Sequence, residues 1–185
     1  MQDFDVVLKR NPNNSTFFSY RANAHSELKE YEKAIADWTQ VIRLNSQNPI
    51  ASQFDTFNLN FFDAIPYYNR GLNYNSLGAY NKAIGDFTQA ILLNSLYSAA
   101  YNNRGISYKN LGEYDKAIAD YNQAISLNPQ YADAYFNRGY SYKNLGEYDK
   151  AIADYRQAAD LYQLQGNTEN FQKVLSFIEE IEKLK

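Results

Sequence analysis

Arginine and aspartate recur in this sequence at a fixed distance, and together they could either bind an anion or neutralise each other. Each of four arginines is followed sixteen residues later by an aspartate, in the pairs Arg21 and Asp37, Arg70 and Asp86, Arg104 and Asp120, and Arg138 and Asp154. A row of free arginines would attract anionic ligands. Charged side chains are rarely buried without a partner, however, and the constant spacing favours ion pairs within a repeated unit. We therefore expect these arginines to stabilise the fold.

Residues suited to catalysis are scarce. The chain has no cysteine and a single histidine, His25, so the sequence does not support a thiol nucleophile, a thiolate metal site or a Ser-His-Asp arrangement. The acidic pairs Glu113/Asp115 and Glu147/Asp149 come at expected helix starts, where the helix dipole favours them. The sequence also has no glycine-rich phosphate loop. We expect a protein that is not an enzyme and that uses no cofactor or metal.

The composition fits a folded domain and disfavours nucleic acid as a partner. The 185 residues are 45% apolar and 21% charged, enough to bury a core. Lys and Arg number 18 against 21 Asp and Glu, whereas domains that bind nucleic acid carry a basic excess. No apolar run approaches the roughly 20 residues of a membrane span, and the acidic start is unlike a secretory signal. We expect a soluble, cytoplasmic protein that does not insert into membranes.

The sequence contains an internal repeat with a period of 34 residues. Residues 101–121 recur almost unchanged as residues 135–155, and a glycine returns at the same interval as Gly71, Gly105 and Gly139. Within each repeat, large and small residues follow a helical spacing, a Leu-Gly turn interrupts them, and a second helical stripe follows. One such pair of helices cannot bury its own stripe, so neighbouring pairs must stack.

The first copy of the repeat differs from the other three. It has Ala22 in place of the recurring glycine, His25 in place of a tyrosine and Lys29 in place of the turn glycine. We expect His25 to be a satisfied, partly buried histidine rather than a pH switch or a ligand. An insert of 15 residues follows this copy, and its phenylalanines have a helical spacing. We expect a short extra helix there, and then a second helix that Asp63 caps just before Pro66.

The unit resembles the tetratricopeptide repeat. In the third copy the matching residues are Tyr101, Arg104, Gly105, Tyr108, Gly112, Tyr114, Ala117, Tyr121, Ala124 and Pro129. Arginine at the second of these places is a departure, because the family often has leucine there. The resemblance implies an all-α fold, a right-handed α-solenoid of antiparallel helix pairs that ends in a C-terminal capping helix.

The repeat pattern divides the chain into seven segments. Residues 1–14 are a partial preceding repeat or an N-terminal capping helix, and residues 166–185 are the C-terminal capping helix. The Phe-rich insert occupies residues 49–63. The four repeats are residues 15–48, 64–97, 98–131 and 132–165.

The resemblance implies that the first helices of the repeats line a peptide-binding groove. Three asparagines, each two residues before a recurring glycine, would face this groove: Asn69, Asn103 and Asn137. A side-chain amide can donate and accept at once, so such a ladder could hold an extended peptide by its main chain. Solvated asparagines are the alternative. The remaining groove residues would be Tyr68, Asn102, Phe136, Asn73, Ile106 and Tyr140.

These features point to a non-enzymatic protein–protein interaction module with a protein or peptide partner. A basic grip on a C-terminal carboxylate, known in part of the family, is not expected, because Ser19, Ala99 and Asn103 stand where that grip has Lys and Arg. The alternative function is a self-assembling scaffold, a homo-oligomer formed through the N-terminal half-unit and the insert. The self-association residues would then be Phe4, Val7, Leu8, Phe54, Phe57 and Phe61.

Overall fold

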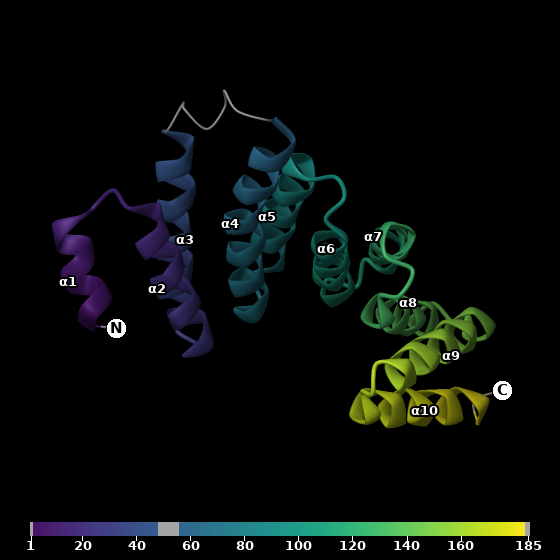
Figure 1. Cartoon of the computed structure of the whole chain (residues 1–185). Helices are drawn as coiled ribbons and strands as arrows, with labels where there is room; N and C mark the ends of the chain where they lie inside the picture. The colour runs from purple at the N-terminus through teal and green to yellow at the C-terminus, as the bar shows by residue number, and fades with distance from the viewer. Residues whose placement is uncertain (1, 48–55, 184–185) are drawn as a thin grey trace. The chain divides into compact units, whose positions relative to one another are not determined.

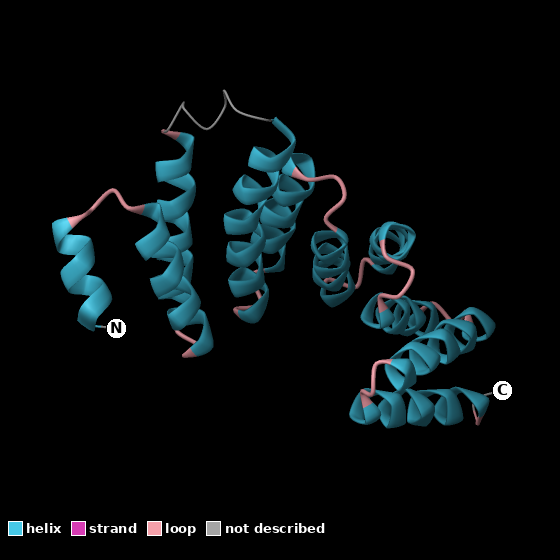
Figure 2. Cartoon of the chain, viewed as in Figure 1, coloured by secondary structure: helices cyan, strands magenta, loops and turns pink. Residues whose placement is uncertain are grey.

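The computed structural model describes residues 2–47 and 56–183, and the regular secondary structure in these ranges is helical (Figures 1 and 2). The helices are α1 (Gln2–Arg10), α2 (Ser15–Glu27), α3 (Tyr31–Ser46), α4 (Thr56–Ser76), α5 (Tyr80–Leu93), α6 (Ser98–Asn110), α7 (Tyr114–Leu127), α8 (Ala132–Asn144), α9 (Tyr148–Leu164) and α10 (Thr168–Glu182). None of these helices is both long and apolar enough to cross a lipid bilayer.

The helices belong to two compact units, Met1–Ser95 and Leu96–Lys185. In the first unit α2 pairs with α3 and α4 with α5, while α3 packs on α4 and α1 on α2. In the second unit α6 pairs with α7 and α8 with α9, while α7 packs on α8 and α10 on α9. Figure 1 shows the two helices of each pair side by side. The predicted all-α fold of stacked helix pairs is confirmed.

The recurring glycine allows the two helices of a pair to approach closely. A Cβ atom at Gly105 would lie 2.6 Å from the ring of Tyr121, which is fully buried in the facing helix α7. A Cβ at Gly71 would lie 2.8 Å from Phe87, and the same contact recurs in the fourth repeat. Carbon atoms do not pack this closely, so any side chain at these places would push the helices apart.

The turn inside each helix pair depends on a residue with a left-handed backbone. Gly78, Gly112 and Gly146 have φ values of 70°, 76° and 77°, a region that glycine enters without steric cost. In the first repeat Lys29 occupies the same turn with φ 60°. A non-glycine residue in this conformation is strained, and the first repeat keeps its turn at that cost.

The start of α4 corrects one sequence-based expectation. The helix begins at Thr56 and runs without a break through Pro66 to Ser76, so Asp63 lies inside it and does not cap it. Pro66 removes one backbone N–H donor, yet it is buried, and tertiary packing outweighs its low helix propensity. The helical part of the insert is therefore continuous with the first helix of the second repeat.

Candidate functional site

The four arginine–aspartate pairs are ion pairs across the two helices of each repeat. In the third repeat Arg104 donates from Nε to Oδ2 of Asp120 at 2.8 Å and from Nη2 to Oδ1 at 2.7 Å. The pairs of Arg21, Arg70 and Arg138 repeat this two-point geometry at 2.6–2.8 Å. The hydrogen bond to Asp120 raises the pKa of Arg104, against a smaller opposing effect of burial. The ion-pair interpretation is confirmed, and this row holds no free arginine for an anion.

In the first, second and fourth repeats, a third guanidinium nitrogen joins the arginine to the second helix that comes before it. Nη1 of Arg138 in α8 donates to Asn122 of α7 at 2.6 Å, and Nη1 of Arg70 in α4 donates to Thr39 of α3 at 3.0 Å. Nη1 of Arg21 makes the equivalent bond to Asp5 of α1 at 2.6 Å. Helix α1 thus stands toward α2 as the second helix of a repeat stands toward the next repeat, which supports the half-repeat interpretation of residues 1–14.

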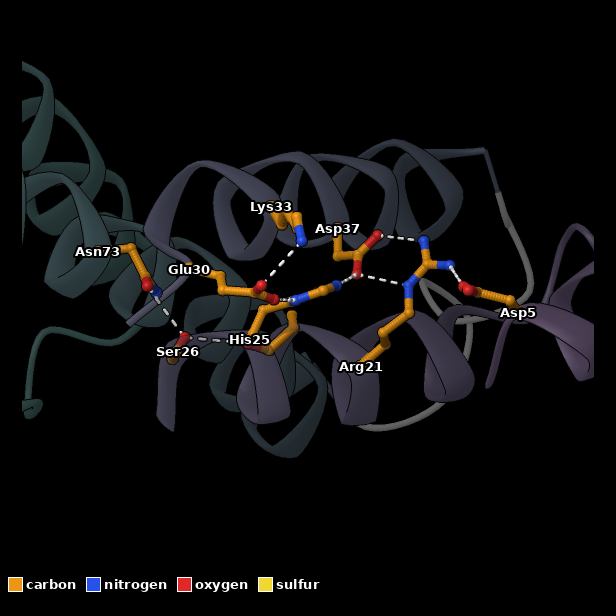
Figure 3. Close-up of polar contacts among 9 residues, drawn as sticks. Asp5, Arg21, His25, Ser26, Glu30, Lys33, Asp37 and Asn73 are labelled. Carbon is orange, nitrogen blue, oxygen red and sulfur yellow. Dashed lines mark hydrogen bonds and ion pairs between the residues drawn. The ribbon is translucent and has the colours of Figure 1, made fainter. Parts of the chain in front are cut away.

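His25 lies buried in a cluster of charges in the first unit, and every charged group there has an opposite partner (Figure 3). Its Nδ1 is 2.5 Å from Oε2 of Glu30, and its Nε2 is 3.9 Å from Oδ2 of Asp37. Glu30 also accepts from Lys33 at 2.8 Å, and these two hydrogen bonds, that of Lys33 first, lower the pKa of the Glu30 carboxyl.

The same cluster lines a cavity of about 480 Å³, together with Leu28 and Ala36. Its polar atoms are occupied by one another, as Figure 3 shows for Asp5, Arg21 and Asp37. No group of His, Cys, Asp and Glu side chains in residues 2–47 and 56–183 is arranged to hold a metal ion. His25 is buried and has a hydrogen-bonding partner in Glu30, as expected for a satisfied histidine.

The asparagines expected in the groove differ in exposure and in what they bind. Asn137 and Asn102 are buried, and Asn137 donates to Asn102 at 3.4 Å. Asn73 is also buried, where it accepts from Ser26 of α2 at 2.9 Å (Figure 3). These three amides join first helices of neighbouring repeats, α6 to α8 and α2 to α4.

Asn103 and Asn69 are half-buried and lie in different units. Asn103 donates to the carbonyl of Ala99, one turn earlier in its own helix, at 2.9 Å. Each of the two units thus has one half-buried asparagine of the expected ladder, whereas Asn137 is buried. The amide groups of both Asn103 and Asn137 make hydrogen bonds within the chain.

Aromatic side chains form a continuous contact between α8, α9 and α10 in the second unit. The ring centroid of Phe136 lies 5.6 Å from that of Tyr155 and 5.5 Å from that of Phe177. Phe136, Tyr140 and Phe177 are only half-buried, so part of each ring faces solvent. Ile106 of α6 is half-buried as well. In the first unit the expected groove residue Tyr68 lies against Phe87, at a centroid distance of 5.8 Å.

Three lysines on the first helices stand over these aromatic rings, and the sequence-based prediction did not include them. Lys109 lies 5.1 Å from the ring centroid of Tyr140 and donates to Oδ1 of Asn137 at 3.2 Å. Lys173 of α10 lies 5.6 Å from the centroid of Phe136, and Lys143 lies 5.4 Å from that of Phe177. The sequence does contain a pattern that could have indicated two of them, because a lysine recurs four residues after the glycine, as Lys109 and Lys143.

The residues expected to mediate self-association are placed unevenly. Leu8 is 7% exposed, so it packs inside its own chain, whereas Phe4 and Val7 are half-buried. Phe54 lies outside the described residues. Phe57 and Phe61 belong to α4, but their side chains also lie outside the described part of the structure.

Family comparisons agree with the repeat pattern. Models described as TPR repeat or tetratricopeptide repeat match residues 21–48, 64–95, 86–119, 107–146 and 132–163. Together these matches cover the four repeats apart from the ends of the first and fourth. None of the curated proteins matches the chain in sequence.

Solved structures of similar proteins show the same fold. A crystal structure of MamA is 27% identical, with a TM-score of 0.74 over 89% of this chain and 87% of its own. The TPR domain of Arabidopsis OM64 is 28% identical, with a TM-score of 0.59 over 70% of this chain and 94% of its own. The second TPR of Spaghetti (RPAP3), bound to an HSP90 peptide, is 30% identical, with a TM-score of 0.52 over 53% of this chain and 91% of its own. Repeat pattern, helix pairing and these matches agree: the chain belongs to the tetratricopeptide-repeat family.

Proposed function

We propose that this chain is a non-enzymatic interaction module that binds an extended segment of a partner protein on the α6–α8–α10 face of its second unit. The observation that carries the proposal is the set of half-buried aromatic rings on this face, Phe136, Tyr140 and Phe177, which touch side chains of the neighbouring first helices. Rings of this size offer apolar area that a bound segment can cover, at about 25 cal/mol for each Å² removed from water.

Polar groups at the same face suit a main chain. Asn103 is half-buried, and an amide side chain is of the type that can bind a peptide main chain. One such bond contributes only about 0.5–1.5 kcal/mol, so the rings must supply most of the affinity. In the first unit, Asn69 and Tyr68 are a second, separate candidate for contact with a partner.

A related protein supports peptide binding. The second TPR of Spaghetti (RPAP3), which is 30% identical over 53% of this chain, was solved with an HSP90 peptide bound. Residues suited to catalysis are few: the chain has no cysteine, and its single histidine lies between two carboxylates. Binding of a protein segment is therefore the function that these side chains support best.

A random-peptide display selection on the purified chain tests this function. The selected peptides should bind the Ile106→Ala/Tyr140→Ala variant weakly, because both truncations remove apolar area from the α6–α8–α10 face. The control variant is Leu92→Ala/Leu164→Ala, which removes similar apolar groups that are 71% and 84% exposed elsewhere on the surface.

Both variants should keep the helical signal of the parent and remain folded at the assay temperature, so that a loss of binding reports on the face and not on the fold. The absence of any enriched peptide would count against the proposal. Equal weakening in the two variants would move the site away from this face.

A further inference from the structure

Lys109 and Lys173 hold two ammonium groups over the same turn of α8. Lys109 comes from the last turn of α6 and stands over Tyr140, and Lys173 comes from α10 and stands over Phe136. Phe136 and Tyr140 are separated by about one helical turn, so the two charges lie over one short stretch of α8. The expected peptide face therefore carries a concentrated positive charge at its centre.

Other cations around this turn are neutralised by carboxylates. Arg104 and Arg138 are paired with Asp120 and Asp154, and Lys143 is 2.7 Å from Glu180. Lys109 and Lys173 differ, because neither makes an ion pair with any acid in the part of the chain that the structure describes. The only hydrogen-bond acceptor of Lys109 found there is the neutral amide of Asn137.

The positive charge of Lys173 also acts on Lys109. The pKa of the Lys109 ammonium is lowered, first by burial and then by the positive charge of Lys173. An anion that lies between the two ammonium groups would offset both the burial of Lys109 and its repulsion by Lys173. Lys109 is half-buried and Lys173 is exposed. This pair differs from the neighbouring Arg104, Arg138 and Lys143, each of which has a carboxylate partner within the unit.

We propose that Lys109 and Lys173 receive a side-chain carboxylate, from Asp or Glu, of an acidic segment in the partner protein. The proposal rests on the proposed function, because the segment is the one that would lie across Phe136, Tyr140 and Phe177. A segment that crosses the face presents side chains to α8, and an acidic one complements the two ammonium groups while its neighbours cover the rings.

The chemistry of the place favours carboxylate over phosphate. The arginines of α6 and α8 are already held by aspartates at two points, so no bidentate guanidinium is available for a phosphate. Lys109 lies in the last turn of α6, and both lysines lie over the middle of α8. Backbone N–H groups at these places are bonded within the helices, so none is left to bind a phosphate. Two point charges beside aromatic rings remain, and these suit a carboxylate on a peptide.

Fluorescence anisotropy with a defined probe tests the proposal. The probe is a labelled oligoglutamate peptide with both ends blocked, and the matched neutral probe is end-blocked oligoglutamine. The full chain should bind oligoglutamate at low ionic strength and should not bind oligoglutamine. The variant Lys109→Gln/Lys173→Gln should bind oligoglutamate about fivefold more weakly or worse, because two attractive charges are lost.

The control is Lys116→Gln/Lys150→Gln, which changes the net charge by the same amount at exposed lysines that pair with Glu113 and Glu147. Its affinity for oligoglutamate should stay within about twofold of that of the parent, because these lysines lie outside the proposed binding site at Lys109 and Lys173. Equal weakening by the two double variants would show general charge attraction and would overturn the proposal. Failure of the full chain to bind oligoglutamate would overturn it as well.

Further experiments identify the source of the anion and distinguish this inference from the proposed function. Oligoglutamine with a free C-terminus that binds as well as oligoglutamate would identify a terminal carboxylate and overturn the side-chain source. If inorganic phosphate displaced oligoglutamate far better than acetate did, the ligand of the two lysines would be a phosphate group, and the carboxylate proposal would be overturned. Display-selected peptides that need Tyr140 but bind the lysine variant normally would leave the proposed function intact and refute this inference alone.

Discussion

Arg138 holds Asp154 at two points, from Nε at 2.7 Å and from Nη2 at 2.6 Å, and this geometry recurs in every repeat. The aspartates of these pairs are buried, with exposures of 4–6%. A buried ion pair adds little over an apolar pair of the same volume, but removing one partner strands the other charge. The pairs therefore constrain which residues can change alone.

Replacing one partner should destabilise the fold much more than replacing both. Asp120→Ala leaves Arg104 without its carboxylate, and we expect the free energy of unfolding to fall by about 3 kcal/mol. Arg104→Met/Asp120→Leu should cost clearly less, since no charge is stranded. Chemical denaturation measures both. The control Asp160→Ala, at an exposed position of α9, should change stability by no more than about 0.5 kcal/mol. An additive pair of single substitutions would contradict this account.

Two glycines in helices should respond to alanine with opposite signs. Gly105→Ala places a methyl group 2.6 Å from the Tyr121 ring, so we expect a loss of about 1–3 kcal/mol despite the better helix propensity of alanine. Gly85→Ala in α5 meets no atom within 4 Å and should stabilise the chain by about 0.5–1 kcal/mol. Thermal and chemical unfolding of the two variants should move in opposite directions. A stabilised Gly105→Ala variant would show that the helix pair can open without cost.

The strained turn of the first repeat offers a stabilising substitution. Lys29 has φ 60°, so Lys29→Gly should raise the free energy of unfolding by about 0.5–1 kcal/mol, as strain is relieved. The reverse change at the matching turn, Gly112→Ala with φ 76°, should destabilise by about 1 kcal/mol. Denaturant midpoints of the two variants check both values. If Lys29→Gly lowered stability, the lysine would have to make a contribution that its exposed position does not suggest.

The Glu30 carboxyl should make the free energy of unfolding depend on pH in the acid range. Its pKa is lowered from the ordinary value of 4.5 by the hydrogen bonds of Lys33 and His25, so its contribution is present above that value. As the pH falls through the lowered pKa the carboxyl is protonated, and the contribution is lost. Glu30→Gln should therefore be less stable than the parent at neutral pH, and the difference should vanish in strong acid.

Unfolding curves across the acid range measure this difference. The control is Glu27→Gln, which removes the same charge from a nearby exposed position of α2. Parallel curves for the parent and Glu30→Gln over the whole range would show that the carboxyl contributes nothing through its charge.

The features that the sequence predicted correctly are those encoded within one repeat. Helix pairing, the glycine contact and the arginine–aspartate pairs each involve residues of a single hairpin, so a 34-residue period is enough to reveal them. The start of α4 was missed because Pro66 argues for a boundary by local propensity, whereas packing of the buried proline decides the outcome.

The candidate site was harder to predict because it depends on contacts between repeats. The burial of Asn137 follows from Asn102 and Lys109 in the preceding repeat, which no single-repeat pattern contains. Lys173 escaped notice because α10 lies beyond the last full repeat, so no periodic position pointed to it. Whether the half-buried rings and asparagines bind a partner stays a prediction.

The Nη1 bond that Arg21, Arg70 and Arg138 make to the preceding helix has a consequence for how such chains can vary. It joins Arg138 to a residue 16 positions earlier, but joins Arg70 to a residue 31 positions earlier, across the insert. The same hydrogen bond between neighbouring repeats therefore forms with connecting segments of different lengths. Junctions between repeats are thus open to insertion during evolution and in protein engineering, as long as the arginine and its acceptor are retained.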